Sequence, residues 1–277
     1  MKEPFVLIKD QYMLIDSWRQ KNLQLVAGFT TKNGGVSTGE FQTLNTGFHV
    51  GDKLDDVQGN RRIIADKLMY PLNEWIGAEQ THETNIHQVT SRDCGRGAAD
   101  YDSAFKATDG FYTKDPNVLL TLCYADCVPL YFLAPAHGMI GVAHAGWKGT
   151  VNGIARKMVE AWLNEGIKAS EIFAVIGPSI CSKCYVVDDY VMDLVQNSLV
   201  DIDEKPYNLI SEGQYQLDLK QLNALILQKS GIPNSQIDVT SYCTSCDHEL
   251  FFSHRRDNGK TGRLMSFIGW KEDLELQ

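Results

Sequence analysis

Short apolar runs recur along the chain, separated by polar or turn-forming residues. Runs rich in Val, Ile, Phe and Tyr, with Gly, Pro, Asp or Asn at their ends, are typical of β-strands. The pattern predicts strands at residues 23–31, 118–125, 128–135, 138–145, 171–178 and 236–244. The sequence APAHG at 134–138 is the turn expected between the two central runs.

Helical spacing of apolar residues lies between these runs. Over 150–166, apolar residues recur every three or four positions, which predicts one helix. A second helix is expected to begin at Asp55 or Asp56 and to end before Pro71, and a third covers 218–231. Strands and helices mixed in this way predict an α/β or α+β protein.

Composition and charge narrow the class of protein. The 277 residues are 43% hydrophobic, and without an evident linker or repeat we expect a single domain over 1–277. A formal net charge of -9 argues against non-specific binding to nucleic acid. There is no apolar run long enough for a membrane span and no signal peptide. With an odd number of cysteines, seven, we expect a cytoplasmic protein with reduced thiols.

Two C-x-x-C pairs stand out, CSKC at 181–184 and CTSC at 243–246. Four thiolates are a common ligand set for structural zinc. The pairs lie much further apart in the sequence than in ordinary zinc ribbons, and a core of this size folds without a metal. We therefore expect that the two pairs do not share a metal ion.

Cys127 and His144 are a less obvious pair of candidate site residues than the C-x-x-C cysteines. Each lies where a predicted strand meets a turn, so adjacent strands can bring them together. A helix start follows at Gly146–Thr150, and its free N–H groups favour an anion. His82 lies in a similar strand-to-turn setting, so two histidines and one cysteine would resemble a catalytic zinc site with one position open. A buried cysteine and a hydrogen-bonded histidine without a metal are the alternative.

A series of motifs then matches, in order, those of the YfiH/YlmD laccase-domain family. They are GFTTKNGGVSTGEFQTLNTGFHVGD (28–52), GNRR (59–62), EQTH (79–82), DGFYT (109–113), ADCVPL (125–130), AHAGWKGT (143–150), IGPSI (176–180) and FFSHRRDNGKTGR (251–263). The resemblance covers nearly the whole chain. It implies an α+β fold of one layered α/β/β/α sandwich with mixed sheets.

The same resemblance implies a metal site and two activities. The family's metal ligands correspond to His82, Cys127 and His144, with zinc as the expected ion and copper as a replacement. The implied reactions are phosphorolysis of purine nucleosides (adenosine, inosine, methylthioadenosine) and deamination of adenosine. The expected partners are therefore purine nucleosides and phosphate. The oligomeric state stays open, with a homodimer as one option.

Candidate roles follow for further residues near these motifs. A deaminase needs a carboxylate that moves protons, and Glu83 or Asp126 can supply it. Phosphorolysis needs an anion pocket, for which the candidates are Arg61, Lys148, Arg255 and Arg256, and Asn45 of the first motif joins the substrate-binding set. Lys148 stands where many relatives carry Arg, which keeps the charge but loses a bidentate contact.

Three other functions remain open from the sequence. Multicopper oxidases need several coppers and many histidines, whereas this chain has seven histidines without an H-x-H pair, so phenol oxidation is at most a side activity. A cysteine hydrolase would use Cys127 as nucleophile and His144 as base. A non-catalytic nucleotide or metal sensor would bind ligand without turnover.

Overall fold

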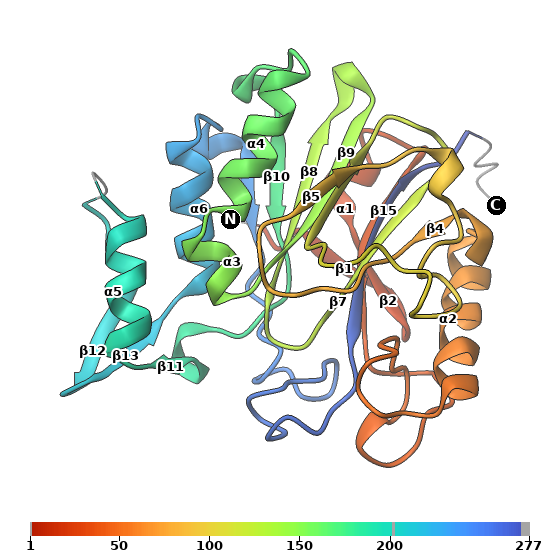
Figure 1. Cartoon of the computed structure of the whole chain (residues 1–277), viewed down its shortest axis with the longest axis horizontal. Helices are drawn as coiled ribbons and strands as arrows, with labels where there is room; N and C mark the ends of the chain where they lie inside the picture. The colour runs from red at the N-terminus through yellow and green to blue at the C-terminus, as the bar shows by residue number, and fades with distance from the viewer. Residues whose placement is uncertain (1, 201–202, 273–277) are drawn as a thin grey trace.

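Two six-stranded sheets form the centre of the molecule in a computed structural model, which describes residues 2–200 and 203–272 (Figure 1). The first sheet has the order β1 (Phe5–Lys9), β2 (Tyr12–Ile15), β3 (Leu25–Thr30), β15 (Leu264–Trp270), β7 (Leu119–Tyr124), β4 (Trp75–Ile76). The second has the order β14 (Ile237–Val239), β10 (Phe173–Ile176), β8 (Val128–Ala134), β9 (Met139–Ala145), β6 (Gly110–Thr113), β5 (Ile86–Gln88). Both sheets are mixed, because β4 pairs in parallel with β7, and β14 and β5 pair in parallel with β10 and β6.

Helices cover the outer faces of both sheets, and a small third sheet stands at one side. The helices are α1 (Asp16–Arg19), α2 (Leu54–Leu68), α3 (Trp147–Val151), α4 (Ile154–Asn164), α5 (Asp189–Ser198) and α6 (Leu219–Lys229). Short 3₁₀ segments are η1 (Gly39–Phe41), η2 (Leu72–Glu74), η3 (Ser91–Asp93), η4 (Pro135–His137), η5 (Ala169–Glu171), η6 (Ser182–Cys184) and η7 (Asn234–Gln236). The third sheet has the order β11 (Val186–Val187), β13 (Gln214–Leu217), β12 (Tyr207–Ser211).

The layers follow from alternate burial along the strands. In β8, Leu130 and Phe132 pack into the cluster that contains Met158 of α4, whereas Tyr131 packs into the cluster between the two sheets. A strand buried on both faces has no polar positions, which is why its whole sequence is apolar. Figure 1 shows α2 on the opposite side of the sheets from α4 and α6, and Ile64 of α2 belongs to a third apolar cluster. The α+β class and the α/β/β/α layering are confirmed.

The predicted elements agree with the structure with two exceptions. The strand expected over 236–244 is only the short β14, Ile237–Val239. The helix expected over 150–166 is two helices, α3 and α4, because the chain turns at Gly153, where φ is +82°. A positive φ suits glycine and ends a helix. By contrast, the expected helix at 218–231 forms as α6, and the Asp218 carboxylate accepts a hydrogen bond from the N–H of Gln221 as its N-cap. In the described part of the chain, no helix is long and apolar enough to cross a membrane.

Candidate active site

The β8–β9 hairpin brings Cys127 and His144 together. Cys127 directly precedes β8, and His144 is the last but one residue of β9. The two strands are antiparallel, with Val128 opposite Ala145 and Pro129 opposite His144. The cysteine and the histidine therefore lie at the same end of neighbouring strands, as the sequence predicted.

His82 joins this pair from the loop between β4 and β5. The candidate ligand atoms of His82, Cys127 and His144 all lie within 4.8 Å of one another, and the two imidazole rings are 4.7 Å apart, centroid to centroid. His82 has a φ of +63°, an uncommon value for a residue other than glycine. Such strained backbone is found where the surroundings hold a side chain in a required position.

Asp109 fixes the orientation of His144 and of the His82 loop. The buried carboxylate places Oδ1 2.8 Å from Nδ1 of His144, and it accepts hydrogen bonds from the backbone N–H groups of Thr81, His82 and Glu83. With Nδ1–H donating to Asp109, the Nε2 lone pair of His144 is free to bind a metal. The sequence analysis quoted Asp109 in the DGFYT motif without assigning it this role.

Gly146 makes room for the ligands. A Cβ at this position would lie 3.0 Å from Cδ2 of His82 and 3.1 Å from Sγ of Cys127. Both distances are shorter than ordinary carbon contacts, so any side chain here would push the two ligands apart. The glycine of AHAGW is thus required by the close approach of His82 and Cys127.

The electrostatics of the site favour a thiolate. Burial by itself raises the pKa of Cys127, but the neighbouring His144 and His82 outweigh it and lower the pKa to about 6. Burial lowers the pKa of His144, but the Cys127 thiolate and Asp109 outweigh it and raise the pKa to about 9, so a metal ion that binds here would replace the proton on Nε2. One sulfur and two imidazole nitrogens form a donor set that suits zinc or copper, and three protein ligands leave a position open.

Asp126 supports Cys127 from the loop before β8. It has a φ of +84°, and both carboxylate oxygens accept hydrogen bonds, from the Thr244 hydroxyl at 2.6 Å and from the Arg255 backbone N–H at 2.7 Å. Its own carbonyl accepts the N–H of Ile180. These contacts give Asp126 a positioning role, and they argue against its predicted use as a proton shuttle. Glu83 is exposed next to His82 and is the better candidate.

The side chains of Arg61 and Asn45 form hydrogen bonds to other parts of the protein, whereas the sequence predicted contacts with substrate. The buried guanidinium of Arg61 donates from Nε to the Thr46 carbonyl and from Nη1 to the carbonyls of Gly97 and Ala98. The Asn45 side chain is likewise engaged at both ends, and its Oδ1 accepts the backbone N–H groups of Gly47 and Arg263. These hydrogen bonds hold loops in place, and a contact of Arg61 or Asn45 with substrate stays a prediction.

The other predicted cations also differ from the expectation. All three nitrogens of the Arg256 guanidinium are hydrogen-bonded within its own segment, to Asp257 and to the carbonyls of Thr244, Ser245 and Phe251. Arg256 therefore holds that segment together, and its expected contact with substrate stays a prediction. Lys148 is exposed on α3, with Nζ 5.6 Å from the Trp147 ring centre.

Two basic residues that the sequence analysis did not single out lie beside the metal ligands. Arg263 is half-buried; only Nη1 of its guanidinium has a hydrogen-bond partner among the described residues, namely the carbonyls of Thr261 and Gly262. Burial lowers the pKa of Arg263, whereas the nearby thiols of Cys123 and Cys127 and the Asp126 carboxylate raise it. The pKa of His49 is lowered by partial burial and then by the charges of Arg263 and Arg61. Arg263 directly precedes Leu264, which pairs with Tyr124 beside His144, and its side chain packs against Gly47, two residues before His49. Arg263 and His49 are called the Arg263 patch below, and Arg263 supplies its charge.

An aromatic pocket lies near Asp126, the residue before Cys127, because Arg255 in its lining donates its backbone N–H to the Asp126 carboxylate. It has a volume of about 390 Å³ and is lined by Trp147, Tyr185, Val186, Val187, Asp188, Val191, Gly213, Gln214 and Arg255. Trp147 belongs to the AHAGWKGT motif, and the Arg255 guanidinium lies 5.0 Å from the Tyr185 ring centre. Burial, followed by the charge of Cys127, raises the pKa of Tyr185, so its hydroxyl stays protonated and can donate a hydrogen bond.

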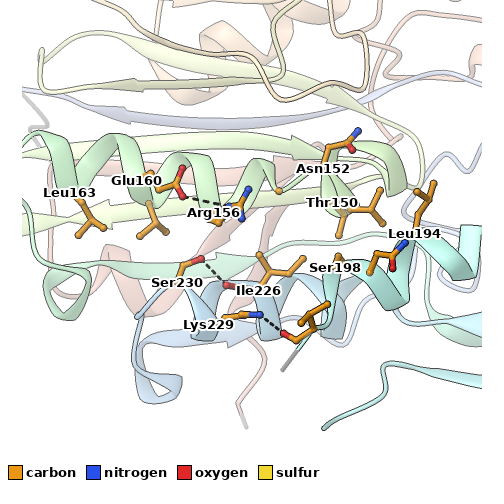
Figure 2. Close-up of a pocket in the computed structure, with 15 residues that line it drawn as sticks. Thr150, Asn152, Arg156, Glu160, Leu163, Leu194, Ser198, Ile226, Lys229 and Ser230 are labelled. Atoms are coloured by element: carbon orange, nitrogen blue, oxygen red, sulfur yellow. Dashed lines mark hydrogen bonds and ion pairs between the residues drawn. The ribbon is translucent and has the colours of Figure 1, made fainter. Parts of the chain in front are cut away.

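A larger hollow lies away from these residues. Figure 2 shows it between α4, α5 and α6, with Thr150, Arg156, Glu160 and Lys229 among its labelled side chains. Its volume is about 630 Å³, and its lining includes none of the three candidate metal ligands. The chemistry of the site is thus centred on the β8–β9 hairpin and not on this larger hollow.

Comparison with known proteins agrees with this geometry. A family model described as multi-copper polyphenol oxidoreductase laccase matches residues 26–271. The chain is 54% identical over 273 residues to purine nucleoside phosphorylase YlmD of Bacillus subtilis (strain 168), covering 97% of this chain and 98% of that protein. A protein of the same name from Geobacillus stearothermophilus is 51% identical over 249 residues, covering 90% of this chain and 91% of its own.

Two solved structures are also similar to this chain in fold and in sequence. The crystal structure of YlmD from Geobacillus stearothermophilus superimposes with a TM-score of 0.95 at 47% identity and covers 98% of this chain and 100% of its own. The Bacillus licheniformis hypothetical protein YfiH superimposes with a TM-score of 0.94 at 52% identity and the same coverage. With its fold, its motifs and its whole length matched, the chain belongs to the multi-copper polyphenol oxidoreductase laccase family.

Proposed function

We propose that this protein is a metal-dependent purine nucleoside phosphorylase whose ion is held by His82, Cys127 and His144. The observation that carries the proposal is the convergence of His82, Cys127 and His144, whose candidate ligand atoms all lie within 4.8 Å of one another. The guanidinium of Arg263 and the aromatic pocket at Trp147 and Tyr185 are the two surfaces that we assign to the substrates. Phosphorolysis brings together an anion and a nucleoside, and the two neighbouring surfaces have the chemistry to bind one each. The names of the relatives agree with this reaction.

Phosphate is assigned to the Arg263 side. Nε and Nη2 of Arg263 have no hydrogen-bond partner among residues 2–200 and 203–272, so they are available to the two oxygens of an anion. His49 reaches solvent beside them and adds a donor. Asn45 positions the patch by accepting the Arg263 backbone N–H at 2.8 Å.

The nucleoside is assigned to the pocket of Trp147 and Tyr185. Purines bind well to aromatic surfaces and to guanidinium planes, both of which this pocket offers. Asp188 lines the same pocket and can accept hydrogen bonds from ribose hydroxyls. In this arrangement C1′ of the ribose lies towards the patch that holds phosphate.

The ion expected in the site is zinc, and the described donors fit it. Zinc supplies Lewis acidity, which stabilises negative charge that develops on a bound group and makes water more acidic. Asp109 holds His144 in the tautomer that binds a metal, and Gly146 keeps His82 and Cys127 in reach of the same point. Copper binds the same kind of donor set and can replace zinc.

The reaction balances without a further reactant. The C1′–N9 bond of the nucleoside breaks, and an oxygen of hydrogen phosphate forms a bond to C1′. The electron pair of the broken bond stays on the purine, which takes up one proton, equal to the one that hydrogen phosphate gives up. The products are the free base and ribose 1-phosphate.

Deamination of adenosine is a second candidate activity of the same site. Glu83 favours it, because this exposed carboxylate directly follows His82 in the sequence and its own N–H is held by Asp109. A carboxylate next to a metal with an open position can move protons between water and the amino group, as in other deaminases. The reaction consumes water and releases ammonia, so it is independent of phosphate.

Product analysis tests both activities. Purified protein is incubated with adenosine or inosine, with and without phosphate, and the products are separated by liquid chromatography. We expect adenine or hypoxanthine and ribose 1-phosphate only with phosphate, a slower conversion of adenosine to inosine without it, and loss of both in Cys127→Ala. Full phosphorolysis by a metal-free Cys127→Ala protein would contradict the proposal.

Further tests on the same purified protein distinguish the alternative functions. A multicopper oxidase needs several copper sites, whereas His82, Cys127 and His144 are the only histidine-containing group of candidate metal ligands in the described part of the chain. A cysteine hydrolase would keep its activity after chelation and lose it on alkylation of Cys127. A sensor would be stabilised by nucleoside without converting it.

A further inference from the structure

Four cysteines gather at one end of the second sheet, on two segments that are distant in the sequence. Strands β10 and β14 are parallel neighbours, with Ala174 opposite Ile237, so the chain leaves both at the same end. Beyond the strands, Ser179 pairs with Cys243, and the N–H of Thr244 donates to the Ser179 carbonyl at 3.1 Å. Parallel pairing thus brings the segment that contains Cys181 beside the segment that contains Cys243.

This arrangement corrects the expectation from the sequence. Cys181 and Cys243 are 62 residues apart in the chain, and that separation was the reason to expect that the two C-x-x-C pairs do not share a metal. In the structure, the ligand sulfurs of all four cysteines lie within 4.8 Å of one another. The cluster consists of Cys181, Cys184, Cys243 and Cys246.

The spacing of the sulfurs is that of a tetrahedral thiolate site. A zinc–sulfur bond of about 2.3 Å places the corners of the tetrahedron about 3.8 Å apart. Sγ of Cys246 lies 3.9 Å from Sγ of Cys181 and 3.4 Å from Sγ of Cys184. All four thiols are free, so no disulfide accounts for their proximity.

Backbone hydrogen bonds support a charged sulfur at Cys243. Its Sγ accepts the N–H of Cys181 at 3.2 Å and the N–H of Cys246 at 3.4 Å. A neutral thiol is a weak acceptor, whereas a thiolate that binds a metal is stabilised by donors of this kind. Cys243 is buried and Cys246 is exposed, so a metal ion can reach the cluster from the surface.

We propose that Cys181, Cys184, Cys243 and Cys246 bind a structural zinc ion that ties the η6 segment to the segment after β14. Four thiolates in a closed set leave no open position, which is the form of a structural site. This second ion is separate from the one assigned to His82, Cys127 and His144, and the two sites share no ligand.

The structural zinc also supports the active site through Asp126. Each cysteine segment contacts this residue: the N–H of Ile180, next to Cys181, donates to the Asp126 carbonyl, and the hydroxyl of Thr244, next to Cys243, donates to the Asp126 carboxylate. Asp126 directly precedes Cys127 and has a positive φ that these contacts hold. Locking the two segments together therefore fixes the backbone from which Cys127 projects.

Metal analysis tests the proposal. Full-length protein is purified under reducing conditions, and zinc per chain is measured by mass spectrometry of the elements. We expect two equivalents in the wild type, one in Cys127→Ser and one in the double variant Cys184→Ser, Cys246→Ser. Cys94→Ser is the matched control, because this half-buried thiol lies in neither cluster, and it should keep both ions. Zinc that is wholly lost in Cys127→Ser would overturn the proposal.

A spectroscopic test remains if the double variant does not fold. The variant Cys127→Ser, whose four-cysteine cluster is intact, is loaded with cobalt in place of zinc. A tetrahedral thiolate site then gives strong thiolate-to-cobalt charge-transfer absorption. Absence of these bands, or two disulfides in the mass of the unreduced protein, would overturn the proposal. Because Cys127→Ser lacks the catalytic ligand, the outcome is independent of whether the protein is a phosphorylase.

The link to Asp126 has its own test. Thr244→Val removes one hydrogen bond to Asp126 and leaves every cysteine in place. We expect this variant to keep the four-cysteine zinc and to bind the active-site zinc about tenfold more weakly in a chelator competition, a loss like that of other groups that orient metal ligands. Unchanged affinity would show that the cluster does not support Cys127 through this residue.

Discussion

Nδ1 of His144 lies 2.8 Å from Oδ1 of Asp109, and both side chains are buried. The pair connects β9 to the start of β6, and its carboxylate also accepts three backbone N–H groups of the His82 loop. One side chain thus sets the position of two of the three ligands.

Asp109→Asn should weaken metal binding while the protein stays folded. The amide has one acceptor oxygen where the carboxylate has two, and it lacks the charge that orients His144. Groups of this kind typically contribute about 10–100-fold to metal affinity. A chelator competition measures the loss. Asp115→Asn is the control, since Asp115 also accepts a backbone N–H, from Ser91, but lies beyond the opposite end of β6 from Asp109. Equal affinity in both variants would argue against the role of Asp109.

Arg263→Gln should impair the phosphate-dependent reaction and leave deamination nearly unchanged. A charged ligand to a bound anion typically contributes a few kcal/mol, so we expect phosphorolysis at low phosphate to fall roughly a hundredfold. Steady-state rates at varied phosphate measure this. An equal loss of both activities would mean that Arg263 acts on the fold or the metal.

Arg61→Ala should reduce stability more than it reduces phosphate specificity. The guanidinium donates to three buried or half-buried carbonyls, and each acceptor left without a donor costs about 1–3 kcal/mol. We expect the free energy of unfolding to fall by on the order of 3 kcal/mol in denaturant titrations. A variant of wild-type stability that lost only its phosphate dependence would restore the assignment made from the sequence.

Phosphate should raise the pKa of His49. In the free protein, partial burial, Arg263 and Arg61 lower this pKa below its ordinary value, so the ring is neutral at pH 7. An anion bound beside the ring favours the protonated form, which shifts the titration to higher pH. Nitrogen NMR of the imidazoles with and without phosphate measures the shift. His137, which contacts Glu171, is the internal control and should not move. If His49 titrates identically in both conditions, phosphate does not bind at this patch.

Gly146→Ala should lower metal affinity without unfolding the protein. The added methyl would lie 3.0 Å from His82 and 3.1 Å from Cys127, so one of the two ligands must move. His82 is the more exposed, and we expect it to move first. Metal affinity by competition and melting temperature by calorimetry separate the two effects. Gly59→Ala controls for the substitution itself, because Gly59 does not have a positive φ and its Cβ would meet only a methyl group of Val36, at 3.2 Å. A full set of ligand contacts retained in Gly146→Ala would show that the loop adapts.

Periodicity in the sequence predicted the central elements well. Strands β8 and β9 are buried on both faces, and such strands give the uninterrupted apolar runs that are easiest to recognise. The short strand β5 and the paired strands β12 and β13 were missed, because their residues are mostly exposed or half-buried and no apolar run marks them. The apolar spacing also continues across Gly153, so the sequence predicted one helix where the structure has two, α3 and α4.

For the site, the sequence indicated which residues carry reactive groups but not which groups are free. His82, Cys127 and His144 lie together as expected. Arg61 and Arg256 carry the charge that phosphate needs, yet loop carbonyls already use their donors, a fact that depends on tertiary contacts. The two C-x-x-C pairs were not expected to share a metal ion, because they lie far apart in the sequence. The parallel pairing of β10 and β14 nevertheless brings the two pairs together.

The unequal burial of the three metal ligands has a consequence for exchange of the ion. Cys127 and His144 are anchored in one hairpin, and His144 is only 2% exposed, whereas His82 lies on an exposed loop. In the proposed metal site we therefore expect His82 to be the first ligand to leave the ion and the last to bind it. Chelators and competing ions such as copper would meet the site from this exposed side, so we expect exchange of the metal to depend on the His82 loop.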